Sequence, residues 1–244
     1  MPRFAGMLTP HRRRGVEYLD EPGVDATVVR RSLRDVALSN RLFGGTRVVL
    51  AELAPALAEA RRSNGNRPAA LSLLDVGTGL GDIPARARTL ATKRGIRLTT
   101  FGVEGNEALA RLADAPVLPM IRGDALSLPL RDRSVDIVMC SQLLHHFDSE
   151  KGVALLRELD RVARRRVIVS DLRRSWLAAA GIWLASWLLL FHPVSRHDGF
   201  VSVLRGFTGN ELRDLVRRAT ARVPTIRLWA GFRISATWNP LEGV

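Results

Sequence analysis

The stretch LLDVGTGLGD, residues Leu73–Asp82, decides the predicted fold. An apolar run from Leu71 to Val76 predicts a strand that is covered on both faces. Glycines follow at every second position, at Gly77, Gly79 and Gly81. Apolar spacing then predicts a helix over Ile83–Lys93. Because glycines between a strand and a helix let the backbone approach a ligand closely, the stretch predicts a ligand-binding turn at the carboxyl edge of a sheet.

The spacing of the glycines indicates what kind of ligand this turn binds. A dinucleotide-binding turn has the pattern Gly-x-Gly-x-x-Gly and faces a pyrophosphate. Here the third glycine comes one residue early, and the next residue is Asp82, whose carboxylate repels phosphate. Asp75 adds a second carboxylate at the end of the strand. These departures favour a ligand with positively charged sulfonium and ammonium groups and no phosphate.

The chain after this turn alternates between strands and helices. Further strands are predicted at Arg97–Val103, Val117–Arg122, Val135–Ser141 and Val167–Ser170, with helices near Glu107–Ala113 and over Lys151–Ala163. This order predicts an α/β fold of the Rossmann-like kind, with a mostly parallel sheet between two layers of helices. Two more strand-like runs, Val223–Leu228 and Phe232–Thr237, are separated by Trp229-Ala230-Gly231, which is hairpin spacing.

The N-terminal quarter of the chain reads as helical. Apolar residues recur at helical spacing over residues 27–62, with a break at Gly44-Gly45 and a second helix through Val48–Ala60. Residues 63–68 form the clearest loop. We therefore predict a helical N-terminal extension or lid over residues 1–66, and a core over residues 67–244 with an apolar insert at 174–200.

Carboxylates follow the next two predicted strands. Glu104 ends the second strand, where its carboxylate can accept hydrogen bonds from both hydroxyls of a ribose. Asp124 follows the third strand, where it can accept one from the exocyclic amine of adenine. A lone acid of this kind is usually a solvated loop residue, but three that end successive strands favour an adenosyl ligand.

Together these segments resemble the class I S-adenosylmethionine (SAM)-dependent methyltransferase superfamily, strongly over residues 70–172. The matching stretches are LLDVGTGLGD, FGVEGNEAL, IRGDALSLPL, SVDIVMCSQLLHHF and RRRVIVSDL. The resemblance implies a seven-stranded sheet whose last strand is antiparallel, and SAM as the cofactor. It also implies a set of cofactor-binding residues: Asp75, Gly77, Thr78, Gly79, Gly81, Glu104, Gly105, Asn106, Asp124, Ala125 and Ser141.

Two adjacent histidines follow the fourth predicted strand, where the acceptor should meet the methyl group. His145 or His146 is a candidate general base, since an unperturbed imidazole titrates near pH 6.5. The alternative is that one or both pack structurally against the cofactor loop. The same region lacks the Asn/Asp-Pro-Pro-aromatic turn that is typical of enzymes methylating base amines.

An apolar stretch follows the fifth predicted strand, over Trp176–Phe191, and no formally charged residue occurs between Arg174 and Arg196. A membrane span here would separate the last strands from the sheet. Two alternatives remain: a helix that covers the acceptor pocket, or a helix that lies in a membrane surface. We predict a polar, turn-prone segment at Pro193–Phe200. Predicted acceptor contacts, or a base in the case of His197, are Tyr18, Asn40, Arg41, Phe43, Trp183, Arg196, His197 and Asp198.

The composition constrains the function further. The 244 residues include 37 basic and 24 acidic ones, a net charge of +13, and nearly all the basic residues are arginine. We attribute most of this excess to arginines spread along the chain, because the short arginine runs lack the interleaved aromatics of a base-stacking surface. The single cysteine, Cys140, allows no internal disulfide, and with no secretory signal in the N-terminus we expect a cytoplasmic protein. No metal site is predicted.

Three functions fit these features. The first is methylation of a small apolar acceptor, on a hydroxyl of a phenolic, quinone-like or polyketide-derived lipid, as in quinone biosynthesis and secondary metabolism; methylation of a ring carbon is the variant. The second is methylation of RNA, which the charge favours and the missing Pro-Pro motif and the apolar insert oppose. The third is a non-catalytic, SAM-binding protein at a membrane. The sequence leaves the oligomeric state open.

Overall fold

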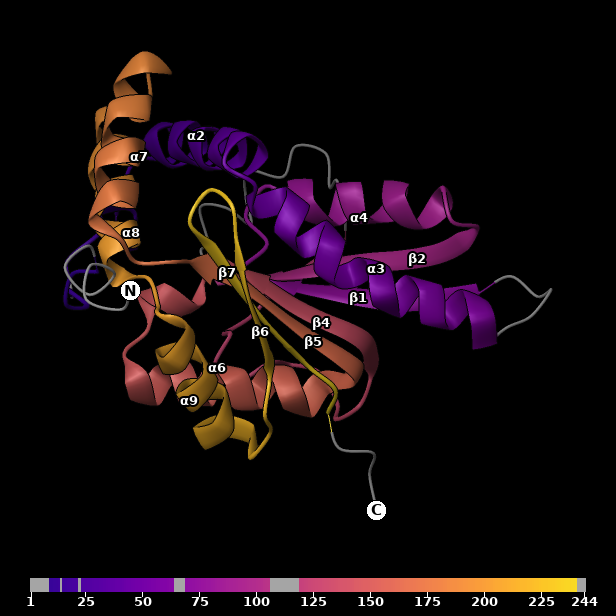
Figure 1. Ribbon diagram of the computed structural model, residues 1–244. Coiled ribbons are helices and arrows are strands. Elements are labelled where there is room, and N and C mark those ends of the chain that lie inside the picture. The colour runs from indigo at the N-terminus through magenta and orange to yellow at the C-terminus, as the bar shows by residue number, and fades with distance from the viewer. Residues whose placement is uncertain (1–8, 14, 22, 64–68, 106–118, 241–244) are drawn as a thin grey trace.

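The computed structural model describes residues 9–13, 15–21, 23–63, 69–105 and 119–240. A single sheet of seven strands runs through the molecule in the order β3-β2-β1-β4-β5-β7-β6 (Figure 1). The strands are β1 (Ala69–Val76), β2 (Ile96–Glu104), β3 (Met120–Arg122), β4 (Val135–Ser141), β5 (Ala163–Leu172), β6 (Thr225–Trp229) and β7 (Arg233–Trp238). Strands β1 to β5 are parallel, and β7 is antiparallel to both β5 and β6.

Helices cover both faces of this sheet. Helices α3 (Gly45–Ser63) and α4 (Asp82–Thr92) lie on one face, and α6 (Ser149–Val162) and α9 (Gly209–Thr220) lie on the other (Figure 1). Successive side chains of each strand point to opposite faces of the sheet, because the strand is pleated. In β1, Leu73 belongs to the apolar cluster under α3 and α4, whereas Leu74 belongs to the one under α6 and α9. The central strands are buried on both sides for this reason.

A third group of helices gathers beyond the carboxyl ends of β4 and β5. It consists of α2 (Ala26–Leu42), α7 (Trp176–Leu188) and α8 (Pro193–Arg205) (Figure 1). Asp25 caps α2 by accepting a hydrogen bond from the Thr27 amide, and Ser175 caps α7 in the same way at Leu177. Two 3₁₀ turns, η1 (Tyr18–Asp20) and η2 (Leu144–His146), lie beside α8.

The predicted fold class is confirmed, including the antiparallel last strand and the C-terminal hairpin. The break at Gly44-Gly45 falls between α2 and α3 as predicted. The helix expected near Glu107–Ala113 and the start of the strand expected at Val117 lie outside the described residues. Cys140 is buried in β4, as a core residue.

The prediction of a turn-prone segment at Pro193–Phe200 was wrong, because these residues form the first turns of α8. Pro193 occupies the first helical position, where its missing N–H is not needed, and the His192 side chain accepts a hydrogen bond from the Val194 amide. The polar residues in this segment are therefore on a helix, and Ser195 and Asp198 are buried against the rest of the molecule.

The proposed division at residue 66 stays a prediction. Helix α3, which precedes it, contributes Leu53 and Leu57 to the same apolar cluster as strands β1, β2 and β4. The apolar insert forms helices α7 and α8. Among the described residues, no helix is long and apolar enough to cross a membrane.

Candidate active site

A cavity of about 1010 Å³ opens at the carboxyl ends of the parallel strands. Its floor is the glycine turn after β1 together with the residues that follow β4, and helix α2 forms one wall. Helix α8 and the N-terminal segment that contains Glu17 and Asp20 also line it. Five segments that are distant in sequence therefore meet at one edge of the sheet, where ligands of open α/β folds bind.

The glycine turn has the backbone that its sequence requires. Gly77, Gly79 and Gly81 have φ angles of +71°, +53° and +70°, a region that other residues rarely adopt. The turn is fixed by hydrogen bonds from the Gly77 amide to the Val103 carbonyl, 2.8 Å, and from the Gly79 amide to the Glu104 carboxylate, 3.1 Å. A Cβ atom on Gly77 would lie 3.0 Å from two methyl groups of Leu143. A side chain at this position would therefore require Leu143 to shift.

Three carboxylates face the cavity at this end. They belong to Asp75 at the end of β1, Asp82 at the start of α4 and Glu104 at the end of β2. Burial raises the pKa of Asp75 to about 8, against the hydrogen bond from Thr78, and the neighbouring charges of Asp82 and Glu104 raise it further. Burial also raises the pKa of Asp82. This end of the cavity is therefore suited to a positively charged ligand.

Buried polar atoms without hydrogen-bond partners line the same cavity. Among the described residues that line it, they are Oγ of Ser32, Oδ1 of Asp75, Oγ of Ser141 and Nε2 of His145. Buried polar atoms in folded proteins are nearly always paired, so an unpaired atom that borders a cavity points to a ligand. Their positions extend from the glycine turn to η2.

His145 is held by a buried carboxylate at the end of the neighbouring strand. Its Nδ1 atom lies 2.7 Å from Oδ1 of Asp171, and its backbone amide donates to Oδ2 of the same residue at 3.1 Å. Burial raises the pKa of Asp171, but the charge and hydrogen bond of His145 outweigh this, so the pKa lies below its usual value. The ionised carboxylate accepts the Nδ1 proton, which leaves Nε2, on the Glu17 side of the ring, as the nitrogen without a proton.

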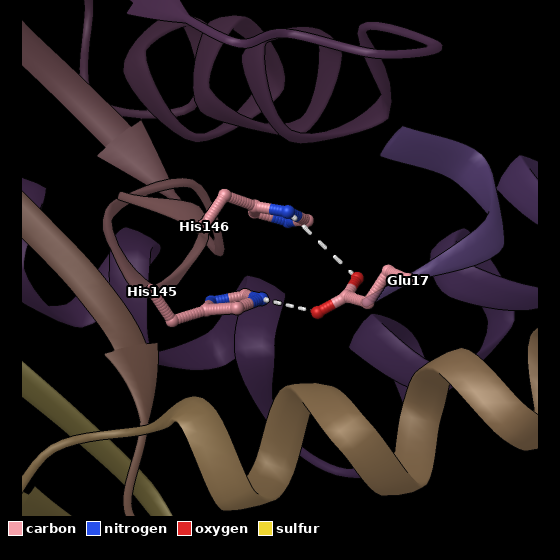
Figure 2. Close-up of side chains that lie close together, drawn as sticks. All are labelled: Glu17, His145 and His146. Carbon is pink, nitrogen blue, oxygen red and sulfur yellow. Dashed lines mark ion pairs between the residues drawn. The ribbon is translucent and has the colours of Figure 1, made fainter. Parts of the chain in front are cut away.

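The N-terminal segment brings two more carboxylates to the histidines. Oε1 of Glu17 lies 3.8 Å from Nε2 of His145, and Oε2 lies 3.8 Å from Nδ1 of His146 (Figure 2). Asp20 lies 3.0 Å from Nδ1 of His146, and Arg205 pairs with both carboxylates at 2.8 and 2.9 Å. Burial lowers the pKa of His146, but Asp20 and Glu17 outweigh it and the pKa lies above its usual value.

Comparison with known proteins identifies the central part of the chain. A family model described as a methyltransferase domain matches residues 74–169, which span β1 to β5 and contain the glycine turn, Glu104 and both histidines. Residues 74–169 thus match a methyltransferase domain, and the fold around them is the one found in solved SAM-dependent methyltransferases. No match is found among curated proteins.

Solved structures with this fold are distant in sequence from this chain. One chain of the complex between the Trm112 methyltransferase activator of Haloferax volcanii and its methyltransferase is 14% identical, with 92% of this chain and 98% of that chain covered and a TM-score of 0.53. A SAM-dependent methyltransferase from Thermotoga maritima is 18% identical, with 87% and 99% covered and a TM-score of 0.51. The magnesium protoporphyrin IX methyltransferase of Synechocystis, solved with S-adenosylhomocysteine (SAH), is 18% identical, with 84% and 87% covered and a TM-score of 0.50.

The glycine end of the cavity has residues that fit SAM. The unpaired Oδ1 of Asp75 and the three carboxylates complement a ligand that carries sulfonium and ammonium charges. Glu104 accepts a hydrogen bond from the turn and lies at the end of β2, the position predicted for ribose recognition. The donor set therefore matches the cofactor of the superfamily.

The predicted cofactor residues divide into three groups. Those that line the cavity are Asp75, Gly77, Thr78, Gly79, Glu104 and Ser141. Gly81, Gly105, Asp124 and Ala125 do not line it. Gly81 precedes α4, and the other three follow β2 and β3 at the same sheet edge. Asp124 is exposed and accepts a hydrogen bond from the Leu126 amide, 2.9 Å. Asn106 lies outside the described residues.

The predicted acceptor residues also divide. His145, His146, Asn40 and Asp198 line the cavity, and Asn40 accepts a hydrogen bond from Gln142. Tyr18, Arg41, Phe43, Trp183, Arg196 and His197 do not line it. Trp183 is on the outer side of α7 with about half of its surface exposed, 52%, and Arg196 stacks on Trp187 at 3.9 Å. His197 is half-exposed and contacts Tyr18 and Asp198 instead.

Several residues of the site were not predicted from the sequence. Asp171 could have been found, since it is a fourth carboxylate that ends a predicted parallel strand, as Asp75 and Glu104 do. Glu17, Asp20 and Arg205 carry no such signal, because they meet the histidines only through tertiary contacts.

Proposed function

We propose that this methyltransferase methylates a hydroxyl group of a small, largely apolar acceptor such as a phenolic, quinone-like or polyketide-derived lipid. One observation carries the proposal: a single cavity is lined by both the glycine turn and His145, whose buried Nε2 atom has no hydrogen-bond partner among the described residues. The cavity is large enough for an adenosyl ligand and a second small molecule together, by the usual size of ligand pockets.

The acceptor part of the cavity has an apolar wall. Helix α2 supplies most of it through Val29, Leu33, Val36 and Ala37, and Leu143 and Phe147 contribute from the other side. Leu33 also reaches the glycine turn, where its Cδ2 atom lies 3.8 Å from the position of a Cβ on Gly79. An apolar acceptor held between α2 and η2 would exclude water from the reacting groups.

In this proposal, a histidine side chain takes the proton from the acceptor hydroxyl. Nε2 of His145 accepts it, while Asp171 holds the ring and stabilises the imidazolium that forms. When bound, SAM would supply an electrophilic methyl group on a positively charged sulfur, with SAH as the product that remains after transfer. The chain thus supplies alignment and proton removal.

The outer surface of α7 supports an apolar acceptor that partitions into lipid, and we extend the proposal to binding at an anionic membrane surface. The helix buries only small side chains, Ala178, Ala179 and Ser186. Its large side chains are exposed: Leu177, Trp183, Leu184, Trp187 and Leu188, followed by Leu190. Arg196 stacks on Trp187, and Arg31 donates to the Leu190 carbonyl at 3.3 Å, so positive charge borders the apolar surface. Exposed tryptophans flanked by arginines are typical of helices at lipid headgroups.

The direct test is a methylation assay with purified protein, labelled SAM and a panel of alkyl phenols, quinols and polyketide-type phenolics. We expect label in an ether-linked methyl group of at least one phenolic lipid, identified by mass spectrometry. Transfer of label to RNA, with no turnover of any lipid phenol, would contradict the proposal. Label on a ring carbon would contradict the assignment of a hydroxyl acceptor.

A further inference from the structure

We propose that Glu17, His145 and His146 form a binding site for a divalent transition-metal ion of the zinc class. We further propose that the ion inhibits methyl transfer, because it occupies the atom that accepts the acceptor proton. The inhibition rests on the proposed function, whereas metal binding does not and is measured without any methyl acceptor.

The three side chains are the ligand types that zinc-class ions prefer. Their donor atoms all lie within 4.8 Å of one another, and the three side chains line the cavity (Figure 2). Two imidazoles and one carboxylate are a common protein ligand set for zinc. A fourth position on the ion would face the cavity, where water or an acceptor oxygen could occupy it.

His145 is already oriented as a metal ligand. Ligating histidines usually donate their other ring N–H to a carboxylate, which fixes the tautomer and the ring orientation. Asp171 is in this position, 2.7 Å from Nδ1 of His145. The opposite nitrogen, Nε2, is buried, has no hydrogen-bond partner among the described residues, and faces Oε1 of Glu17 at 3.8 Å.

The spacing requires only a small movement of one segment. Donor atoms around a tetrahedral zinc ion lie roughly 3.3 Å apart, given bonds of about 2.0 Å. The Glu17 oxygens are 3.8 Å from a nitrogen of each histidine. Glu17 precedes the short η1 turn, which Asp198 holds by accepting hydrogen bonds from the Tyr18 and Leu19 amides. A shift of this side chain, and a turn of His146 away from Asp20, would bring the donors within reach of one ion.

The local charge also favours a divalent cation. Glu17, Asp20 and Asp171 bring three carboxylates to the two imidazoles, and Arg205 pairs with Glu17 and Asp20. One arginine leaves this group of side chains with an excess of negative charge. A divalent ion that displaces the proton shared by His146 and Asp20 would balance this excess more fully than the arginine alone.

Binding of Co²⁺ tests the proposed metal site without a measurement of methyl transfer. The full-length protein, freed of metal by a chelator and without SAM, is titrated with Co²⁺, whose visible absorption reports its ligands, and then with Zn²⁺ as competitor. We expect one Co²⁺ per chain, displaced by Zn²⁺. Glu17→Gln and His146→Ala should each weaken Co²⁺ binding at least tenfold. Glu21→Gln, an exposed acid on the same segment, is the matched control and should bind as the wild type does. Absence of a Co²⁺ spectrum, or equal affinity of E17Q and wild type, would overturn the site.

Zinc inhibition is measured with whichever phenolic lipid is methylated. We expect Zn²⁺ to inhibit over the concentration range in which it displaces Co²⁺, with SAM affinity unchanged by calorimetry. Activation by Zn²⁺, with loss of activity in chelator, would overturn the inhibitory role. Normal methyl transfer by a protein that binds no Co²⁺ would refute the metal site alone, and Co²⁺ binding without turnover of any phenol would count against the proposed function alone.

Discussion

Nδ1 of His145 lies 2.7 Å from Oδ1 of Asp171, and both side chains are almost fully buried. His145 follows strand β4 in the η2 turn, and Asp171 is the penultimate residue of the neighbouring parallel strand β5, so the sheet brings the two together. This contact fixes the histidine tautomer and directs Nε2 toward Glu17. In our account, that nitrogen is both the proton acceptor and the strongest metal ligand of the site.

Removal of the histidine should slow catalysis far more than it weakens cofactor binding. We expect His145→Ala to lower kcat by about 10²- to 10³-fold, the usual contribution of a positioned base. Asp171→Asn should lower kcat by at least about tenfold, because the tautomer is no longer fixed. Steady-state kinetics and SAM calorimetry measure the two effects separately, with the exposed His11→Ala as control. Near-normal kcat in both His145→Ala and His146→Ala would show that neither histidine is the base.

Asp75 should make the stability of the ligand-free protein depend on pH. Burial raises the pKa of this carboxyl to about 8, from an ordinary value of 3.8. The folded state therefore binds its proton more tightly than the unfolded state, and this contribution to stability is lost as the pH rises from 4 to 8. The change Asp75→Asn removes this titrating carboxyl, so the stability of the variant lacks this dependence on pH. We therefore compare the Tm of Asp75→Asn with that of the wild type at two pH values. The Tm of the variant, relative to the wild type, should be at least about 4 °C higher at pH 8 than at pH 4. A constant difference across this range would contradict the buried, protonated carboxyl.

A comparison of Gly77 with Gly95, which have nearly the same φ angle, distinguishes backbone strain from loss of cofactor binding. Gly77 and Gly95 have φ angles of +71° and +69°, but a Cβ at Gly77 meets Leu143 at 3.0 Å, whereas nothing lies within 4 Å at Gly95. Each Gly→Ala change should cost about 1 kcal/mol of stability through φ alone. Only Gly77→Ala should also weaken SAM binding, by at least about tenfold. Thermal unfolding and calorimetry on both variants test this, and equal SAM affinity in the two would contradict the assigned role of the turn.

The exposed tryptophans of α7 predict a membrane interaction that depends on charge. The wild-type protein should sediment with vesicles containing phosphatidylglycerol more than with phosphatidylcholine alone, and salt should weaken the effect. The double change Trp183→Ser and Trp187→Ser should reduce the bound fraction severalfold. Val223→Ser, which removes another exposed apolar side chain (74%), follows α9 and is the matched control. Sedimentation of the double variant at wild-type level, or self-association of the wild type in place of vesicle binding, would refute the membrane surface.

The fold was predictable because its signals are local. The run Leu71–Val76, the alternate glycines and the hairpin at the C-terminus each determine structure through neighbouring residues, and all were confirmed. The segment Pro193–Phe200 was misread because its polar side chains suggested a turn. In the folded chain, Ser195 and Asp198 are instead buried against Asp35 and η1.

The site was predictable only in part, for a related reason. Residues that end parallel strands meet at one edge by topology, so Asp75, Glu104 and Ser141 were placed beside the cavity from sequence alone. The contact between Glu17 and the histidines depends on how the N-terminal segment packs on α8. No pattern in the sequence encodes that packing. Trp183 was assigned to the acceptor because it is apolar, but α7 turns its large side chains outward.

Isothermal calorimetry with SAM tests the central claim most directly, namely that the carboxylate-lined end of the cavity holds this cofactor. We predict one SAM bound per chain by the wild type. For Asp75→Asn we predict affinity at least about tenfold lower, since the amide cannot ionise beside the bound cation as the carboxyl can, while Glu150→Gln, an exposed acid on α6 (83%), binds normally. Well-folded wild-type protein that shows no heat with SAM or SAH would contradict the account.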